Sequence, residues 1–360
     1  MNDDFATAMR RSLDQTRAGN PFEATRIIQA ALAGKVDARA EDATSPEASS
    51  RRSREASPRK RLSQVISELS RRPPGLDARP GQQAPAPAVP DGARFERRHH
   101  AGPHGARDYR LFHPSETDAP IRGVILMLHG CTQSPEDFAV GTRMNDHAER
   151  HGLIVAYPEQ AQAHNVSRCW NWFRPADRSR TGGEAALLAD LAASVAREHG
   201  VPTGRVFAAG LSAGGAMAAI LAQTHPEVFA AAGVHSGLAP GSASDVISAF
   251  AAMRGDPAPD AEPLNAPAII FHGSADTTVA PVNAGRIAGP LAEGVARRSE
   301  GRGRRHDVLK ARNAAGHPAE VWRIEGAGHA WAGGHAEGSC TDPEGPDASA
   351  EMVRFFLEQA

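Results

Sequence analysis

The stretch Ala208–Met217 constrains the fold more than any other part of this 360-residue chain. A short apolar run over 205–209 leads into Gly-x-Ser-x-Gly, and a helix-forming run over 216–223 follows. Strand, sharp turn and helix in that order are the context in which this pentapeptide makes a nucleophile elbow. Gly210 and Gly214 are expected there because a Cβ at either position would crowd the neighbouring strand and helix. The alternative is a glycine-rich turn with a buried serine, since 35 of the residues are glycine and chance matches occur.

Apolar runs alternate with helix-forming segments through the rest of this region. Continuous apolar runs are typical of strands buried on both faces of a parallel sheet. The alternation predicts an α/β fold, with a mostly parallel central sheet and helices on both faces. A hairpin over 94–113 precedes the sheet, and a helix over 349–358 closes the chain. The predicted strands cover residues 123–128, 153–157, 206–209, 229–235, 268–272 and 319–324.

Composition divides the chain into three parts. Residues 1–34 show apolar residues at helical spacing with capping signals, which predicts a helical hairpin. Residues 35–92 are rich in Pro, Ser and Arg and lack enough apolar surface to fold, which predicts a mostly disordered linker. Residues 93–360 are the predicted catalytic domain.

Charge and hydropathy exclude several classes of partner. The formal net charge of −2 provides no overall field that would favour nucleic acid or an anionic membrane. No apolar run approaches the length of a transmembrane segment. The acidic N-terminus lacks the apolar region of a signal peptide, which predicts a cytoplasmic protein, with an extracellular location as the alternative. The oligomeric state stays open.

The predicted catalytic groups follow the strands in a fixed order. A serine hydroxyl needs a base, a group that orients the base, and donors for the oxyanion that forms. In α/β-hydrolases these groups come in the order serine, acid, histidine, each on a loop after a strand. Asp276 follows the strand that ends near residue 272, and His329 follows the strand that ends near residue 324. We predict Ser212 as nucleophile, His329 as general base and acid, and Asp276 as the group that orients the imidazole.

Other titratable residues compete for the acid and base roles, namely Asp245, Asp256, Glu325, His235 and His335. Neither aspartate has a strand immediately before it, and the glutamate lies too near the predicted base in sequence. The first histidine ends a strand and is expected in the core or beside the site, whereas the second lies in a glycine-rich stretch. His99, His100 and His104 have no carboxylate or cysteine at ligand spacing, so we expect surface histidines and no metal.

Two backbone amides are expected to bind the oxyanion. One belongs to Ala213, directly after the nucleophile, and the other to the loop after the first buried strand. Gly130 lets that loop turn tightly, which makes the Cys131 amide the expected donor. The alternative for Cys131 is a small buried residue without a role.

Six stretches, taken together and in order, resemble the poly(3-hydroxybutyrate) depolymerase family of esterases. The resemblance runs from about residue 93 to the C-terminus and implies an α/β-hydrolase fold and a carboxylic-ester hydrolase. It implies Ser212, Asp276 and His329 as the triad, in agreement with the strand order. Relatives include feruloyl and acetylxylan esterases, so the family does not fix the substrate, and the missing signal peptide departs from secreted members. The stretches are Leu128-His-Gly-Cys-Thr-Gln133, Cys169-Trp-Asn-Trp-Phe173, Gly182-Gly-Glu184, Gly210-Leu-Ser-Ala-Gly-Gly-Ala-Met217, His272-Gly-Ser-Ala-Asp276 and Gly328-His-Ala-Trp-Ala-Gly-Gly334.

A small aromatic segment stands out in a chain that is only 5% aromatic. Trp170, Asn171 and Trp172 are expected to line the substrate cleft, together with Trp331 beside the predicted base. Packed core is the alternative for such a cluster.

The chain has three cysteines, too few for a disulfide scaffold. We hypothesise that Cys131 and Cys169 are neighbours that can form a disulfide and anchor the aromatic segment to the oxyanion loop. Cys340 would then be unpaired. In a reducing compartment the pair would remain buried thiols.

The expected function is that of a metal-independent serine esterase without a cofactor, working through an acyl-enzyme. The expected substrate is a short-chain hydroxyalkanoate ester, oligomeric or polymeric. A feruloyl- or acetyl-esterase acting on polysaccharide esters is one alternative. A non-catalytic protein that binds a polymer granule or a partner is the other.

Overall fold

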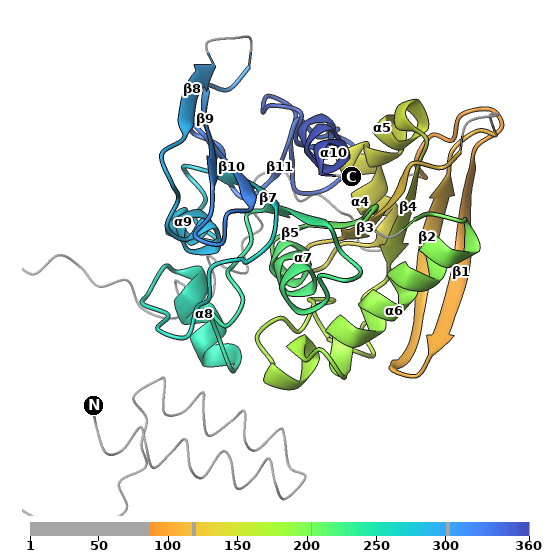
Figure 1. Ribbon diagram of the computed structural model, residues 1–360, viewed down its shortest axis with the longest axis horizontal. Coiled ribbons are helices and arrows are strands. Elements are labelled where there is room, and N and C mark those ends of the chain that lie inside the picture. The colour runs from red at the N-terminus through yellow and green to blue at the C-terminus, as the bar shows by residue number, and fades with distance from the viewer. Residues whose placement is uncertain (1–85, 117–119, 203, 300–302, 360) are drawn as a thin grey trace, which may run out of the picture. The chain divides into compact units, whose positions relative to one another are not determined.

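The computed structural model describes residues 86–116, 120–202, 204–299 and 303–359 (Figure 1). The predicted hairpin over 1–34 and the predicted linker up to residue 85 lie outside the described residues. The first strand begins at Arg94, one residue after the predicted start of the catalytic domain.

In the described part of the chain, ten strands form one sheet in the order β1-β2-β4-β3-β5-β6-β7-β10-β9-β8. The six central strands run parallel to one another. The predicted hairpin β1–β2 is confirmed and pairs antiparallel at one edge, and β8–β9 does so at the other. The strands are β1 (Arg94–Gly102), β2 (Gly105–His113), β3 (Gly123–Leu128), β4 (Leu153–Pro158), β5 (Val206–Leu211), β6 (Ala231–His235), β7 (Ala268–Gly273), β8 (Val295–Ser299), β9 (His306–Arg312) and β10 (Pro318–Ile324).

Helices cover both faces of the sheet. Every residue of β3 is buried, and its side chains alternate between two hydrophobic clusters, one on each face. One cluster includes side chains of α6, α7, α8 and α9, and the other includes side chains of α4, α5 and α10. The helices are α4 (Pro135–Thr142), α5 (Met144–His151), η1 (Pro175–Arg178), α6 (Gly183–Glu198), α7 (Ala213–Thr224), α8 (Val246–Met253), α9 (Val282–Ala288) and α10 (Ala348–Glu358).

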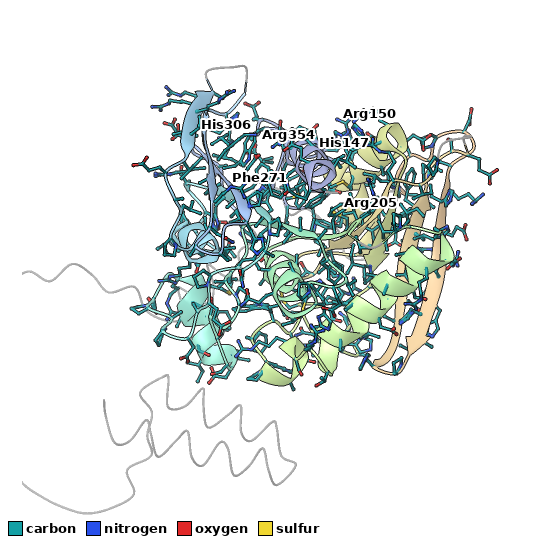
Figure 2. All side chains as sticks on the ribbon, in the orientation of Figure 1. His147, Arg150, Arg205, Phe271, His306 and Arg354 are labelled. Atoms are coloured by element: carbon teal, nitrogen blue, oxygen red, sulfur yellow. A yellow bond between two sulfur atoms is a disulfide. The ribbon has the colours of Figure 1, made fainter. Side chains whose placement is uncertain are left out.

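A row of stacked rings crosses four neighbouring strands on the α10 side. His235 stacks on Phe271 at 5.7 Å between ring centroids, and Phe271 stacks on Trp322 at 5.1 Å. Trp322 in turn stacks on His306 at 5.3 Å (Figure 2). Such rings contribute roughly 0.5–1.5 kcal/mol per pair beyond the area they bury. The row packs β6, β7, β10 and β9 against one another near the C-terminal ends of the three parallel strands.

Three features differ from the sequence prediction. The edge hairpin β8–β9 and the helices α4, α5, α8 and α9 were not predicted. The side chains of β8 are mostly exposed, so its sequence lacks the apolar run of a buried strand. His100 is buried, not on the surface, because its ring contacts Asp190 at 3.0 Å.

No helix within the described ranges is both long enough and apolar enough to cross a membrane. A short parallel pair, β11 (Trp331–Ala332) with β12 (Thr341–Asp342), packs the C-terminal loop ahead of α10.

Candidate active site

Ser212 sits in a strained turn between β5 and α7. Its backbone has φ 58° and ψ −119°, a conformation that costs a non-glycine residue roughly 1–3 kcal/mol. The Ser212 amide donates to the His235 carbonyl at 2.9 Å, which fixes the turn against β6. A Cβ on Gly214 would lie 1.9 Å from the Leu128 carbonyl oxygen, and one on Gly210 would lie 2.4 Å from the Gly214 backbone. The predicted need for both glycines is confirmed, and the turn has the geometry of a nucleophile elbow.

Asp276 and His329 are brought together by the loops after β7 and β10, which are neighbouring parallel strands. His329 Nδ1 lies 2.8 Å from Asp276 Oδ2, and the aspartate side chain is fully buried. The other oxygen, Oδ1, accepts hydrogen bonds from the Thr278 and Val279 amides at 2.9 Å each. The predicted contact between these two side chains is confirmed.

The Asp276 carboxyl is held in its ionised form. Burial acts to raise its pKa, but hydrogen bonds from His272, His329 and the Val279 amide keep the pKa well below its ordinary value. The ionised Asp276 carboxylate accepts a hydrogen bond from His329 Nδ1, which keeps the ring proton on Nδ1. That leaves Nε2 of the neutral ring as the acceptor, the tautomer a general base needs.

The two predicted oxyanion donors are free to bind a ligand. Among the described residues, neither the Cys131 amide nor the Ala213 amide donates a hydrogen bond to the chain. Ala213 is the first residue of α7, where amides have no partner inside the helix and the helix dipole favours negative charge. Two preorganised amides of this kind are what an oxyanion hole requires.

The Ser212 hydroxyl, the predicted nucleophile, makes no hydrogen bond with the predicted base. Ser212 Oγ forms no hydrogen bond with any described residue, and neither does His329 Nε2. Hydrogen bonds between a nucleophile and its base are often long without substrate and shorten in the Michaelis complex.

The loop that bears the Cys131 amide is fixed by a disulfide and by a backbone hydrogen bond. A disulfide joins Cys131 to Cys169, with 4.2 Å between the Cα atoms, and Cys340 is free. The predicted pairing is therefore confirmed. The Thr132 amide donates to the Ser167 carbonyl at 2.8 Å. Thr132 has a φ of 68°, which few non-glycine residues adopt.

The expectation that four residues contact the substrate is corrected by their burial. Trp170 and Trp331 are 0% and 1% exposed, and their indole N–H groups donate to the His129 carbonyl and to Ser349 Oγ. Asn171 and Trp172, at 3% and 5%, are almost as buried. Trp170 and Trp331 thus have no surface to offer a ligand and Asn171 and Trp172 have little, which fits the packed core given as the alternative.

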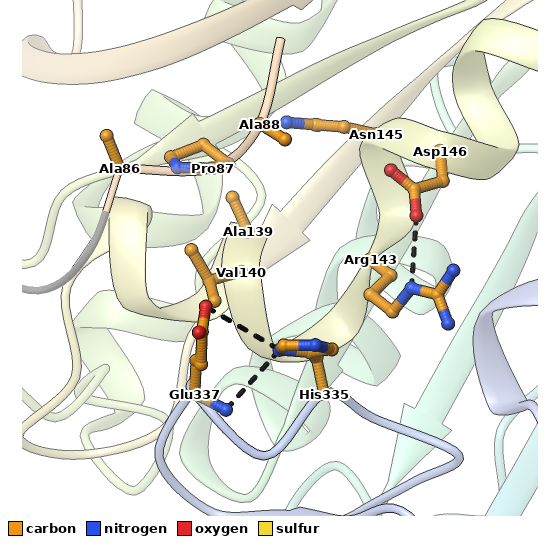
Figure 3. Close-up of a pocket in the computed structure, with 10 residues that line it drawn as sticks. All are labelled: Ala86, Pro87, Ala88, Ala139, Val140, Arg143, Asn145, Asp146, His335 and Glu337. Carbon is orange, nitrogen blue, oxygen red and sulfur yellow. Dashed lines mark hydrogen bonds and ion pairs between the residues drawn. The ribbon is translucent and has the colours of Figure 1, made fainter. Parts of the chain in front are cut away.

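The competing residues lie elsewhere. Asp245 caps α8 by accepting from the Ser248 amide at 2.7 Å, Asp256 pairs with Arg254, and Glu325 is exposed beside two arginines. His335 lies near Glu337 in a cavity of about 390 Å³ bordered by α4, α5 and residues 86–88 (Figure 3). None of the residues that line this cavity belongs to the predicted site.

Two further buried histidines, His235 and His272, lie at the C-terminal ends of β6 and β7. His272 Nε2 lies 2.9 Å from the Val279 carbonyl and 3.5 Å from Asp276 Oδ2. His235 Nε2 accepts from the Ala332 amide at 3.1 Å, and burial lowers the pKa of its ring to about 3. His235 thus fits the predicted place in the core. His272 carries one sequence signal, its position at the end of a buried strand four residues before the predicted acid.

A profile of the family described as "Esterase PHB depolymerase" matches residues 107–295. Poly(3-hydroxyalkanoate) depolymerase C of Paucimonas lemoignei is 34% identical over 182 residues, 46% of this chain and 42% of that protein. Probable acetylxylan esterase A of Aspergillus clavatus is 32% identical over 181 residues, 45% of this chain and 58% of that protein. The chain thus spans about half the length of the curated relatives it matches.

One solved structure supports the fold. An acetyl xylan esterase from Aspergillus awamori superimposes with a TM-score of 0.56 at 19% identity, covering 74% of this chain and all of that chain. At that identity the likeness extends to the fold alone. It agrees with the α/β-hydrolase architecture that the strand order and the elbow describe.

Proposed function

We propose, from the premise that the chain belongs to the esterase PHB depolymerase family, that it hydrolyses carboxylic esters through an acyl-enzyme on Ser212. The observation that carries the proposal is the hydrogen bond between His329 and the buried Asp276, on the loops that follow β10 and β7 in the same parallel sheet as the elbow strand β5. A nucleophile, a base and an orienting acid at one edge of a parallel sheet are the parts that acyl transfer needs.

The reaction proceeds in two steps. His329 Nε2 takes the proton of Ser212 as Oγ attacks the ester carbonyl, and the Cys131 and Ala213 amides bind the oxyanion. His329 then gives that proton to the leaving alcohol, which leaves the acyl group on Ser212. Water, deprotonated by the same ring, releases the acid and restores the enzyme.

The proposed substrate is a short-chain hydroxyalkanoate ester, including its polymer. Large apolar side chains are exposed on α8, which follows β6, the strand next to β5. Another is exposed on α9, which follows β7 and the Asp276 loop. Ile247 is 77% exposed, Phe250 56% and Val282 51%. The Ala280 amide donates to the Met253 carbonyl at 2.7 Å, which joins α8 to the loop that holds Asp276. An apolar surface at this place favours a water-poor, polymeric ester over a hydrated polysaccharide.

A substrate panel tests the reaction and the substrate class together. Nitrophenyl butyrate, hydroxybutyrate oligomers, an acetylated xylan and a feruloyl ester are compared by kcat/KM. We expect turnover of the first two to exceed that of the others, and no turnover by Ser212→Ala. Preference for the xylan or the feruloyl ester would move the substrate to polysaccharide. Absence of turnover on all four would favour a non-catalytic binding protein.

A surface variant tests the apolar patch. Replacing Ile247 and Phe250 with Ser is expected to slow hydrolysis of a polyester film and leave nitrophenyl butyrate turnover unchanged. Burial of each side chain contributes at most about 1.5–3 kcal/mol to adsorption. Val295→Ser is the matched control, because Val295 is 59% exposed on the edge strand β8. Equal film hydrolysis by all three proteins would contradict a polymer-binding role for the patch.

A further inference from the structure

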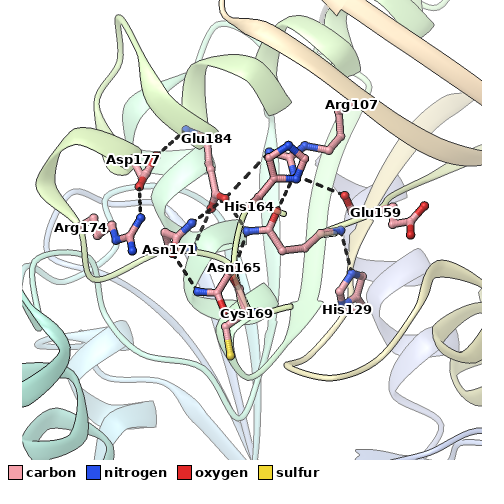
Figure 4. A network of polar contacts seen from close by, with 11 residues as sticks. Arg107, His129, Glu159, His164, Asn165, Cys169, Asn171, Arg174, Asp177 and Glu184 are labelled. Carbon is pink, nitrogen blue, oxygen red and sulfur yellow. Dashed lines mark hydrogen bonds and ion pairs between the residues drawn. The ribbon is translucent and has the colours of Figure 1, made fainter. Parts of the chain in front are cut away.

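A buried polar network lies behind the oxyanion loop, at the start of α6 (Figure 4). Its centre is Glu184, which is 5% exposed and bears no contact with Ser212, Asp276 or His329. Burying a carboxylate costs several kcal/mol unless its oxygens are fully hydrogen-bonded. The network includes side chains from β2, the 159–171 segment and α6, namely Arg107, Gln160, Asn165, Asn171 and Glu184.

The Glu184 carboxylate accepts three hydrogen bonds, all from one segment. Oε1 accepts from Gln160 Nε2 at 2.5 Å and from Asn171 Nδ2 at 2.9 Å, and Oε2 accepts from the Asn171 amide at 2.7 Å. Arg107 Nη2 lies 3.9 Å from Oε1 and is the nearby cation. Burial raises the pKa of Glu184, while the hydrogen bonds and Arg107 oppose that shift. Both oxygens of the Glu184 side chain therefore face donors. A carboxylate can accept on both sides, whereas a side-chain amide would place an N–H group against one of these donors.

The same segment holds the oxyanion loop. The Gln160 amide donates to His129 Nε2 at 3.2 Å, and Trp170 Nε1 donates to the His129 carbonyl at 3.0 Å. Gln160 Nε2 also donates to the carbonyl of Cys169, whose sulfur is bonded to Cys131. Of the residues that bind Glu184, Gln160 is thus hydrogen-bonded directly to His129, and Asn171 is linked to His129 through its neighbour Trp170.

We propose that Glu184 is a positioning residue for the oxyanion hole: through Gln160 and the 169–171 backbone it sets the position of the Cys131 amide. This inference rests on the proposed function. Glu184 touches no reacting atom, so its loss lowers the rate of acylation and not the binding of a small ester.

A variant pair on one helix separates this role from a purely structural one. Glu184→Gln keeps the shape but turns one acceptor into an N–H donor that faces donors. Asp190→Asn is the matched control, because Asp190 lies on the same helix, contacts His100 at 3.0 Å and has no link to the oxyanion loop. Both are compared with wild type in kcat and KM for nitrophenyl butyrate, in Tm, and in affinity for an alkyl trifluoromethyl ketone.

We expect Glu184→Gln to lower kcat by about 10- to 100-fold, less than the 10²–10³-fold loss of a whole oxyanion donor. KM should stay within about threefold of wild type, because a positioning defect acts on the transition state. Affinity for the ketone, which forms an oxyanion on the serine, should fall with kcat/KM. Asp190→Asn should keep wild-type values of kcat, KM and ketone affinity.

Folded Glu184→Gln with wild-type kcat and ketone affinity would overturn the inference, as would an equal loss in Asp190→Asn. If Glu184→Gln does not fold, Gln160→Met, which removes one link and keeps the chain length, is expected to show the same separation of kcat from KM. Failure of the proposed function looks different, because wild type itself would then neither hydrolyse the ester nor bind the ketone, and the inference would fall with it.

Discussion

Replacing Gly214 with alanine tests the contact between the elbow and the oxyanion loop. A Cβ on residue 214 would lie 1.9 Å from the Leu128 carbonyl oxygen and 2.7 Å from the His129 carbonyl oxygen. Both contacts are with backbone, which cannot rotate away as a side chain can. The two segments must separate by about 1 Å before the contact is tolerable, in a core packed as tightly as a crystal.

That shift acts directly on the catalytic geometry, because Leu128 and His129 lead into the loop that bears the Cys131 amide. A displacement of about 1 Å at a reacting centre costs about 10²-fold in rate. The strain of overpacking lowers the free energy of unfolding by about 1–3 kcal/mol. We therefore expect Gly214→Ala to lose about 10²-fold in kcat and to melt at a lower temperature than wild type.

Gly285→Ala is the matched control for this substitution. Gly285 lies inside α9, and a Cβ there would meet nothing within 4 Å. Alanine is favoured over glycine in a helix by about 0.5–1 kcal/mol, so this variant should gain stability and keep its activity. Nitrophenyl butyrate kinetics and thermal unfolding of both variants decide the matter. A Gly214→Ala protein with wild-type kcat and Tm would refute the packing argument.

Three further predictions concern stability, pH and the N-terminal region. Cys169→Ser, which opens a 38-residue loop, should lower the free energy of unfolding by about 4 kcal/mol in the chain-entropy model and lower kcat through the oxyanion loop; urea titration and kinetics measure both. Burial lowers the pKa of His129 to about 4 and that of His235 to about 3, so in acid only the unfolded chain binds these protons. The contribution of these two histidines to the free energy of unfolding should be constant above the ordinary histidine pKa of about 6.5 and should fall below it by up to about 1.4 kcal/mol per pH unit per histidine; a flat profile from pH 7 to 4.5 would contradict this. A chain that begins near Ala93 should hydrolyse a soluble ester with unchanged kcat, and a folded but inactive truncation would move the domain boundary.

The sequence predicts those parts of the fold whose burial is unambiguous. The run over β3 is apolar at every position because both faces are covered, and the elbow glycines are required by backbone contacts that only glycine allows. The edge hairpin β8–β9 escapes prediction because an exposed strand of Val-Ala-Arg-Arg-Ser carries no such pattern. Local sequence therefore identifies the centre of the sheet and the edge hairpin β1–β2, but not the exposed edge hairpin β8–β9.

The candidate site likewise has features that the sequence predicts and features that it does not. The pairing of Asp276 with His329 follows from strand order, since neighbouring parallel strands deliver their loops to one edge. Trp170 and Trp331 were expected at the cleft but are fully buried, because the sequence does not tell whether an indole N–H meets solvent or donates to a buried group. The contacts of His272 and Glu184 join residues from separate elements and become visible only in three dimensions.

The most direct test of the central claim is covalent labelling of the nucleophile. The protein is treated with an alkyl fluorophosphonate, digested, and its modified peptide identified by mass spectrometry. We predict one adduct, on Ser212, formed in step with the loss of nitrophenyl butyrate hydrolysis and absent from Ser212→Ala. An adduct on another residue, or ester hydrolysis that persists in Ser212→Ala within about tenfold of wild type, would contradict the account.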